Sequence, residues 1–125
     1  MNYQLIALDL DGTLLNSRKE IPEESVRAIR EVCAAGKTVV FDTGRAVPEL
    51  AEQIAMLPEV RYAVFASGAG IYDIHEKRAF ALHSLPVSHA NRILSVARDM
   101  TDVDSVYYVI QQLNQGREHQ RKSLS

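Results

Sequence analysis

Side chains that could handle a phosphate group follow three separate apolar runs of this sequence. Each run is four or five residues long and is followed by polar residues and a glycine. The polar residues are Asp9 and Asp11, then Thr43, then Ser67, and the glycines are Gly12, Gly44 and Gly68. Because glycine has no Cβ, the backbone N–H groups beside it can approach an anion closely. The pattern predicts an anion cradle assembled from three segments of the chain.

The first of these segments carries two carboxylates. Asp9 and Asp11 stand two residues apart and would repel each other unless a cation or a shared proton holds them. Oxygen ligands of this kind suit a hard cation such as Mg²⁺. The chemistry that fits is phosphoryl transfer, in which Asp9 attacks phosphorus, the metal neutralises the phosphate oxygens, and Asp11 carries a proton to the leaving group.

The elements that must position these residues alternate between strand and helix. Short apolar runs predict strands at residues 5–8, 38–41 and 62–66, the first of them buried on both faces. Helical spacing predicts helices over 22–35 and from residue 45 or 46 to the proline at 58. Right-handed crossovers bring the carboxyl ends of parallel strands to one edge of the sheet, and the second helix would point its positive end at the same place. The sequence therefore predicts an α/β fold with a parallel sheet in the order 3-2-1.

A hairpin, a third helix and one more strand are expected after residue 70. Residues 71–74 and 78–82 flank a polar turn, residues 87–100 have helical spacing, and residues 103–110 are again apolar. The last residues, 114–125, have no periodic apolar face, so we expect a disordered tail there.

Composition excludes several classes of protein. The 125 residues include 14 Lys and Arg against 16 Asp and Glu, a net charge of −2, which excludes a polycationic nucleic-acid binder, and no nucleic-acid partner is expected. No apolar stretch approaches the roughly 20 residues of a membrane span and no signal peptide is evident, so no membrane partner is expected. The single cysteine, Cys33, excludes an internal disulfide and makes the cytoplasm the expected compartment.

Three segments resemble the motifs of a known family. Residues 9–15, DLDGTLL, resemble the first motif of the haloacid dehalogenase (HAD) superfamily, and residues 43–45, TGR, resemble its second. Residues 67–73, SGAGIYD, are similar to the segment after the third strand in the Cof-type sugar-phosphatase branch, which usually has Asn where Ser67 stands. The resemblance extends over about residues 3 to 112.

This resemblance implies a Mg²⁺-dependent phosphatase, a hydrolase that acts on a small phosphorylated metabolite, in particular a sugar phosphate. It implies an aspartyl-phosphate intermediate on Asp9, general acid/base catalysis by Asp11, phosphate contact by Thr43, and Mg²⁺ bound by the Asp9 carboxylate and the Asp11 backbone carbonyl. The candidate phosphate-binding residues are Gly12, Thr43, Gly44, Arg45 and Ser67. The implied organisation is a Rossmann-like, parallel three-layer core with a hairpin over residues 1–83, followed by the beginning of an α+β cap over residues 84–113.

The second half of the chain departs from the family pattern. Family members carry a later lysine and then a Gly-Asp-x-x-x-Asp motif, and neither can be placed. Lys77 falls in the expected hairpin turn, Lys122 falls in the tail, and Asp99 with Asp102 lacks the glycine and the preceding strand. The chain therefore looks like the first half of a family member, truncated inside the cap. A non-catalytic phosphate-binding or assembly module and one half of a split enzyme stay open as alternatives.

A half-sheet also predicts a partner. Without strands beyond residues 5–8, the first strand would expose an apolar edge that invites pairing with another chain. We therefore expect a homo-oligomer or a complementing chain.

The same residues also have simpler interpretations. A calcium loop beginning at Asp9 would need glycine at its sixth position, which is Leu14. Residues 68–70 lack the third glycine of a dinucleotide fingerprint, and the histidines show no metal-ligand spacing, so neither a dinucleotide site nor a zinc site is expected. Two simpler roles stay open as alternatives to phosphate binding. Arg45 would be a solvated residue in the first turn of the helix, and Ser67 would supply a hydroxyl group to a turn.

Overall fold

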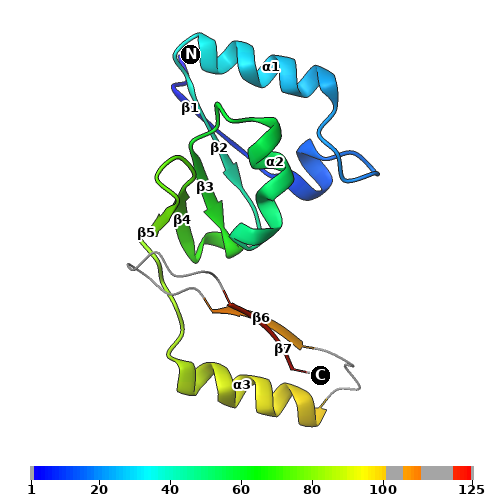
Figure 1. Cartoon of the computed structure of the whole chain (residues 1–125), viewed down its shortest axis with the longest axis vertical. Helices are drawn as coiled ribbons and strands as arrows, with labels where there is room; N and C mark the ends of the chain where they lie inside the picture. Colours follow the sequence, from blue (N-terminus) through cyan, green and yellow to red (C-terminus); the bar gives the residue numbers. More distant parts are fainter. Residues whose placement is uncertain (1, 101–105, 111–119, 125) are drawn as a thin grey trace. The chain divides into compact units, whose positions relative to one another are not determined.

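The computed structural model describes residues 2–100, 106–110 and 120–124 of the chain (Figure 1). The chain divides into two compact units, residues 1–82 and residues 83–125, and each is described by itself. Within the described ranges, none of the helices combines the length and the apolar character that a membrane span requires.

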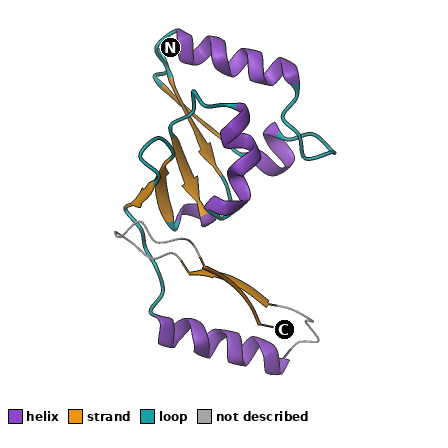
Figure 2. Cartoon of the chain, viewed as in Figure 1, coloured by secondary structure: helices purple, strands orange, loops and turns teal. Residues whose placement is uncertain are grey.

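The first unit is built on a five-stranded sheet (Figure 2). Its strands lie side by side in chain order: β1 (Leu5–Leu8), β2 (Thr38–Asp42), β3 (Tyr62–Phe65), β4 (Gly70–Asp73) and β5 (Arg78–Phe80). Helix α1 (Glu23–Ala34) connects β1 to β2, and α2 (Ala51–Met56) lies between β2 and β3. Strands β1 to β3 are parallel, with Leu8 opposite Phe41 and Phe41 opposite Ala63, whereas β4 and β5 are antiparallel. The predicted α/β fold and strand order 3-2-1 are confirmed.

Local signals at both ends define helix α1. Glu23 and Glu24 occupy its positively polarised first turn, directly after Pro22. Gly36, with a φ of 83°, adopts the left-handed conformation that ends a helix, and its N–H donates to the Cys33 carbonyl at 3.0 Å. The prediction of a helix over residues 22–35 is confirmed to within one residue at each end.

The core lies between these helices and the sheet. Phe41, Leu50, Leu57 and Ala63 are fully buried in one apolar cluster, and so is Leu10, which stands between the two aspartates of the first motif. Burial of each large apolar side chain stabilises the fold by about 1.5–3 kcal/mol. The core therefore anchors the segments that leave the carboxyl ends of β1 and β2.

Strand β1 is less buried than the sequence predicts. Leu5 is 57% exposed, Ala7 is exposed, and Ile6 and Leu8 are half-buried. Within the described part of the chain β1 pairs with β2 alone, so its outer edge offers free backbone N–H and C=O groups. The expected burial on both faces is therefore wrong here, because an apolar run typical of an interior strand occupies an edge.

The second helix begins later than predicted. A 3₁₀ turn over residues 47–50 comes first, and α2 follows it. The Arg45 N–H donates to Thr43 Oγ1 at 3.0 Å, and the Ala46 N–H donates to Glu49 Oε2 at 2.8 Å. Side chains thus satisfy the donors that an earlier helix start would have offered to an anion. The expected positive helix end next to Thr43 is therefore a wrong prediction.

The β4–β5 hairpin is confirmed, and Asp73 explains its turn. The Asp73 carboxylate accepts the N–H groups of His75 and Glu76, each at 3.1 Å. It also pairs with Arg61, whose Nη2 lies 3.1 Å from Asp73 Oδ2. The Arg61 guanidinium is the main cause that holds the pKa of Asp73 below its ordinary value.

The second unit contains α3 (Val87–Met100) and a two-stranded antiparallel sheet of β6 (Val106–Ile110) and β7 (Gln120–Leu124). The predicted third helix is confirmed, and β6 confirms the predicted strand over its described residues. Strand β7 lies inside the segment 114–125 for which the sequence predicts a disordered tail, and it pairs with β6 from Gln120 opposite Ile110 to Leu124 opposite Val106. Residues 101–105, 111–119 and 125, which include Asp102, lie outside the described residues.

Candidate functional site

The segments that follow β2 and β3 are tied together by their backbones. The Ser67 N–H donates to the Thr43 carbonyl at 3.1 Å, and the Ala66 N–H donates to the Arg45 carbonyl at 2.9 Å. A Cβ at Gly44 would lie 3.3 Å from Ser67 Oγ, so a glycine lets the two segments approach this closely. The structure thus brings Thr43, Gly44, Arg45 and Ser67 into one cluster.

Two residues at this cluster have strained backbones. Ala66 and Ser67 have φ values of 48° and 55°, in the left-handed region that costs a residue with a Cβ about 1 kcal/mol or more. The hydrogen bonds to the β2 segment hold them there. As a result the Ser67 side chain is exposed next to Gly44.

Asp9 precedes a tight turn over Leu10–Leu14 at the end of β1, in which Asp11 and Gly12 have non-helical backbone angles. Its Oδ1 accepts the Leu10 N–H at 2.9 Å, and its Oδ2 accepts the Thr13 hydroxyl at 3.2 Å. Gly12 has a φ of 77°, which the turn requires and which glycine adopts without strain. Because Leu10 is fully buried while Asp9 and Asp11 are exposed, the turn presents both carboxylates to solvent.

Arg45 joins Asp11 to the second segment. Arg45 Nε lies 2.7 Å from Asp11 Oδ2, and Arg45 Nη2 lies 2.9 Å from Asp11 Oδ1, which is bidentate geometry. Arg45 Nη1 also donates to the Glu49 carbonyl at 3.2 Å. A further cation, Lys19, places its Nζ 3.1 Å from Asp11 Oδ1. The pair with Arg45 connects residues 34 positions apart in the sequence.

These two cations determine the charge of Asp11. The Arg45 guanidinium, and after it the Lys19 ammonium, holds the pKa of the Asp11 carboxyl well below its usual range. The same contact raises the pKa of Arg45. Asp11 is therefore a carboxylate whose two oxygens both accept hydrogen bonds from cations.

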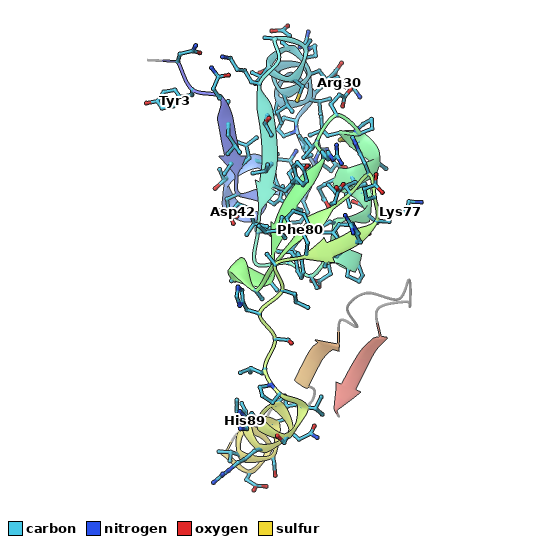
Figure 3. The ribbon with its side chains drawn as sticks, turned by 90° about the vertical axis from the view of Figure 1, so that its left-hand side faces the viewer. Tyr3, Arg30, Asp42, Lys77, Phe80 and His89 are labelled. Atoms are coloured by element: carbon cyan, nitrogen blue, oxygen red, sulfur yellow. The ribbon has the colours of Figure 1, made fainter. Side chains whose placement is uncertain are left out.

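Thr43 supplies a buried hydroxyl to the cluster. Its side chain accepts the Arg45 N–H at 3.0 Å, and its own N–H donates to the Val64 carbonyl at 3.0 Å. With its oxygen already accepting, the hydroxyl proton can be donated to an anion. Asp42, the preceding residue, is an exposed carboxylate at the end of β2, labelled in Figure 3.

Oxygen donors at the end of β1 suit Mg²⁺. This cation usually takes one or two carboxylates and completes its shell with water and phosphate oxygens. The Asp9 carboxylate and the Asp11 backbone carbonyl are donors of that kind, whereas the Asp11 side chain is engaged by cations. Among the described residues, no group of three His, Cys, Asp or Glu side chains could hold a metal ion. The described donors therefore fit a magnesium ion that water and substrate complete.

Sequence reasoning missed three residues at this site: Lys19, Thr13 and Glu49. The family pattern has its phosphate-steadying lysine after the second motif. Lys19 precedes it, eight positions after Asp11, with no periodicity to indicate that the two meet. The available signal was Asn16, a strong turn former that could have predicted a tight loop after the first motif.

Two candidates from later in the chain belong to other elements. Lys77 stands in the hairpin turn with a φ of 53°, and Figure 3 shows it well away from Asp42. Asp99 is exposed near the end of α3, in the other unit. The hydrogen bonds of the Asp9 carboxylate go to Leu10 and Thr13, so Asp9 is connected to the cluster through its neighbour Asp11.

Known proteins match this chain in sequence and in structure. Phosphatase YwpJ of Bacillus subtilis (strain 168) is 37% identical over 92 residues, which are 74% of this chain and 32% of that protein. The 5-amino-6-(5-phospho-D-ribitylamino)uracil phosphatase YcsE of the same organism is 38% identical over 73 residues, 58% of this chain and 29% of that protein. A solved haloacid dehalogenase-like hydrolase from B. subtilis superposes with a TM-score of 0.71 at 33% identity, covering 86% of this chain and 36% of that one.

The chain thus spans about a third of the length of these proteins. The family model for haloacid dehalogenase-like hydrolases matches residues 6–122. The match begins in β1, includes both aspartates, and continues through the segments after β2 and β3 that make up the cluster. The chain belongs to the haloacid dehalogenase-like hydrolase family.

Proposed function

We propose that this chain carries the phosphoryl-transfer half-site of a phosphatase that acts on a small phosphorylated metabolite. One observation carries the proposal: the bidentate pair of Arg45 with Asp11 joins the turn after β1 to the cluster of Thr43, Gly44 and Ser67. A nucleophile, an acid/base and phosphate-binding groups then belong to one connected site. Family membership and relatives named phosphatases support the same reaction.

Each residue has a role in this reaction. An Asp9 oxygen attacks phosphorus, and the bond from phosphorus to the leaving oxygen breaks. The leaving oxygen takes up a proton through Asp11, which must first exchange a contact with Lys19 or Arg45 for that proton, since both of its oxygens accept from these cations in the free site. Water then attacks the aspartyl phosphate, with Asp11 as the base, and releases inorganic phosphate. The Thr43 hydroxyl and the Gly44 backbone N–H would bind the phosphate oxygens.

Magnesium would be held by the Asp9 carboxylate and the Asp11 backbone carbonyl. When bound, this ion would neutralise the phosphate oxygens. Arg45 would hold the Asp11 carboxylate in place beside them, since its guanidinium is itself fixed by the Glu49 carbonyl at 3.2 Å.

The substrate class that we propose is a sugar or polyol phosphate. A relative named for a phosphorylated ribitylamino compound supports this class. Cys33 is a free cysteine, which fits the reducing cytoplasm that we propose as the setting.

Hydrolysis of a generic aryl phosphate by the purified chain tests the proposal. We would measure turnover with Mg²⁺ and with EDTA, in the parent, in Asp9→Asn and in Asp42→Asn. The last variant removes one exposed carboxylate at the end of the neighbouring strand, so it is the matched control. We expect metal-dependent turnover that Asp9→Asn reduces by at least about 10²-fold and that Asp42→Asn retains. Equal background in the parent and Asp9→Asn would contradict the proposal.

A second candidate function has one observation in its favour. The outer edge of β1 is unpaired in the described structure and carries the exposed Leu5. Such an edge suits an assembly module that binds phosphate without turning it over, or one half of a split enzyme whose other half pairs with β1. Phosphate binding without turnover by the chain alone, with turnover restored by a complementing chain, would favour this candidate.

A further inference from the structure

Lys19 stands in a loop that its own hydrogen bonds close. The loop lies between two buried side chains, Leu15 and Ile21. Asn16 Oδ1 accepts the Arg18 N–H at 2.9 Å and the Glu20 N–H at 3.0 Å, and the Asn16 N–H donates to the Glu20 carbonyl at 2.9 Å. The chain is therefore fixed on both sides of Lys19.

Lys19 itself has a φ of 63°, which disfavours residues that have a Cβ. Its N–H donates to the Asn16 carbonyl at 3.0 Å, which helps to hold this conformation. Its side chain reaches Asp11 Oδ1 at 3.1 Å. A strained position thus carries a long cationic side chain that meets the proposed acid/base.

The two cations on Asp11 are not equivalent. Arg45 makes two parallel hydrogen bonds and its side chain is 22% exposed, whereas Lys19 makes one contact and its side chain is 65% exposed. Bidentate guanidinium pairs are stronger and more rigid than single, exposed ammonium contacts. Lys19 is therefore the partner that a competing anion can draw away from Asp11.

A phosphate monoester is such an anion. It carries up to two negative charges, whereas the single charge of Asp11 is already matched by Arg45. Lys19 therefore gains more from the phosphate group than from Asp11. Releasing Asp11 Oδ1 from one of its two cationic donors also allows that oxygen to face the leaving group.

We propose that Lys19 holds Asp11 together with Arg45 in the free site and binds the phosphate group when a phosphate monoester enters. The inference rests on the proposed function, since it assumes that the cluster receives phosphate.

Inorganic phosphate is the probe that tests this inference without turnover. We would titrate the full chain with phosphate in the presence of Mg²⁺ and follow the NMR signals of the Lys19 Cε and of the Arg45 Nε–H. The variants are Lys19→Met, which keeps the length of the side chain without its charge, and Lys19→Arg, which keeps the charge. Arg18→Met is the matched control, because it removes one positive charge from the same loop at a side chain that is 80% exposed.

We expect the Lys19 signal to shift with phosphate and to saturate at the dissociation constant. Lys19→Met should weaken phosphate binding by about fivefold, with Lys19→Arg close to the parent and Arg18→Met within about twofold. An unchanged Lys19 signal at saturating phosphate would overturn the inference, as would equal phosphate affinity in Lys19→Met and Arg18→Met.

Kinetics separate this inference from the proposed function. In a chain that turns over aryl phosphate, Lys19→Met should raise KM, and Lys19→Arg should restore it. Turnover with no effect of Lys19 on KM or on phosphate affinity would overturn the inference alone. A Lys19 effect on phosphate binding in a chain without metal-dependent turnover would overturn the proposed function alone.

Discussion

The Thr43 hydroxyl group has two roles, as a hydrogen-bond acceptor and as a hydrogen-bond donor. Its hydroxyl oxygen accepts the Arg45 N–H, and its hydroxyl proton remains available for an anion. The role as acceptor fixes the backbone at Arg45, the residue whose guanidinium contacts Asp11. A side chain that looks like a phosphate ligand therefore also determines where the acid/base is held.

Thr43→Val, which keeps the shape of the side chain and removes the hydroxyl, tests both roles. We expect the free energy of unfolding to fall by about 1–2 kcal/mol, because the Arg45 N–H loses its acceptor in a part-buried position. Phosphate affinity should fall as well, because the hydroxyl donor is gone. Urea unfolding and phosphate titration measure the two effects. Thr43→Ser, which retains the hydroxyl, is the control. If Thr43→Val were as stable as Thr43→Ser, the role of the hydroxyl as an acceptor would be contradicted.

The hairpin turn shows how one carboxylate can organise an element. Asp73 is 6% exposed, accepts two backbone N–H groups, and pairs with Arg61. Arg61 also lies over the ring of Tyr62, with its Cζ 5.3 Å from the ring centroid. The hairpin is thereby fastened to β3, which carries the strained segment of the candidate site at its end.

The low pKa of Asp73 predicts how stability depends on pH. Its folded-state pKa lies below the ordinary value of 3.8, so the ionised carboxylate adds stability above that value and loses it as pH falls through the folded-state pKa. We expect Asp73→Asn to unfold at a lower temperature than the parent at pH 7, and the difference to shrink in acid. Thermal unfolding over a pH series measures this. Asp42→Asn corrects for the loss of one negative charge, and a difference that stays constant down to acid pH would contradict the prediction.

Most elements could be predicted from the sequence because each carries its own signal. The strand at residues 38–41, the helix over residues 22–35 and the hairpin follow from apolar spacing and turn residues, and the structure confirms them. The late start of α2 could not be predicted in this way, since it depends on Glu49 and Thr43 side chains accepting from the backbone. The spacing of apolar residues indicates which face of a helix is apolar. It does not indicate which backbone N–H groups will donate to side chains.

The site residues at the strand ends could be predicted from the sequence, whereas the contact of Lys19 with Asp11 could not. Strand ends that share a sheet edge predicted that Thr43 and Ser67 would meet, and their backbones are joined by a 3.1 Å hydrogen bond. The contact of Lys19 with Asp11 depends on a loop whose closure is set by Asn16, so no spacing rule contains it. The exposure of Leu5 likewise depends on which strands pair with β1, and the apolar residues of β1 do not determine this.

At the scale of the whole molecule, the outer edge of β1 is the feature that bears on assembly. Leu5 is 57% exposed there, and the strand pairs on one side only within the described residues. Open apolar edges of this kind pair with other chains unless a charge or a proline blocks them. We therefore propose that the isolated chain forms a homo-oligomer through β1.

Light scattering of the parent and of Leu5→Lys measures this prediction. We expect an oligomeric mass for the parent, and a shift to the monomer for Leu5→Lys, because a charge on the edge strand opposes pairing. Met56→Lys is the control, since it places the same charge at another exposed apolar side chain, 45% exposed, at the end of α2. A monomeric parent at working concentration would contradict the proposal.

The strained segment after β3 has a consequence for the order of folding. Ala66 and Ser67 adopt left-handed conformations that an isolated peptide populates poorly, and their N–H groups are held by carbonyls of the β2 segment. The segment can therefore settle only after β2 and β3 have paired, which requires closure of the intervening chain. A newly made chain would acquire this part of its phosphate-binding cluster only after β2 has paired with β3, so phosphate binding would report that this pair has formed.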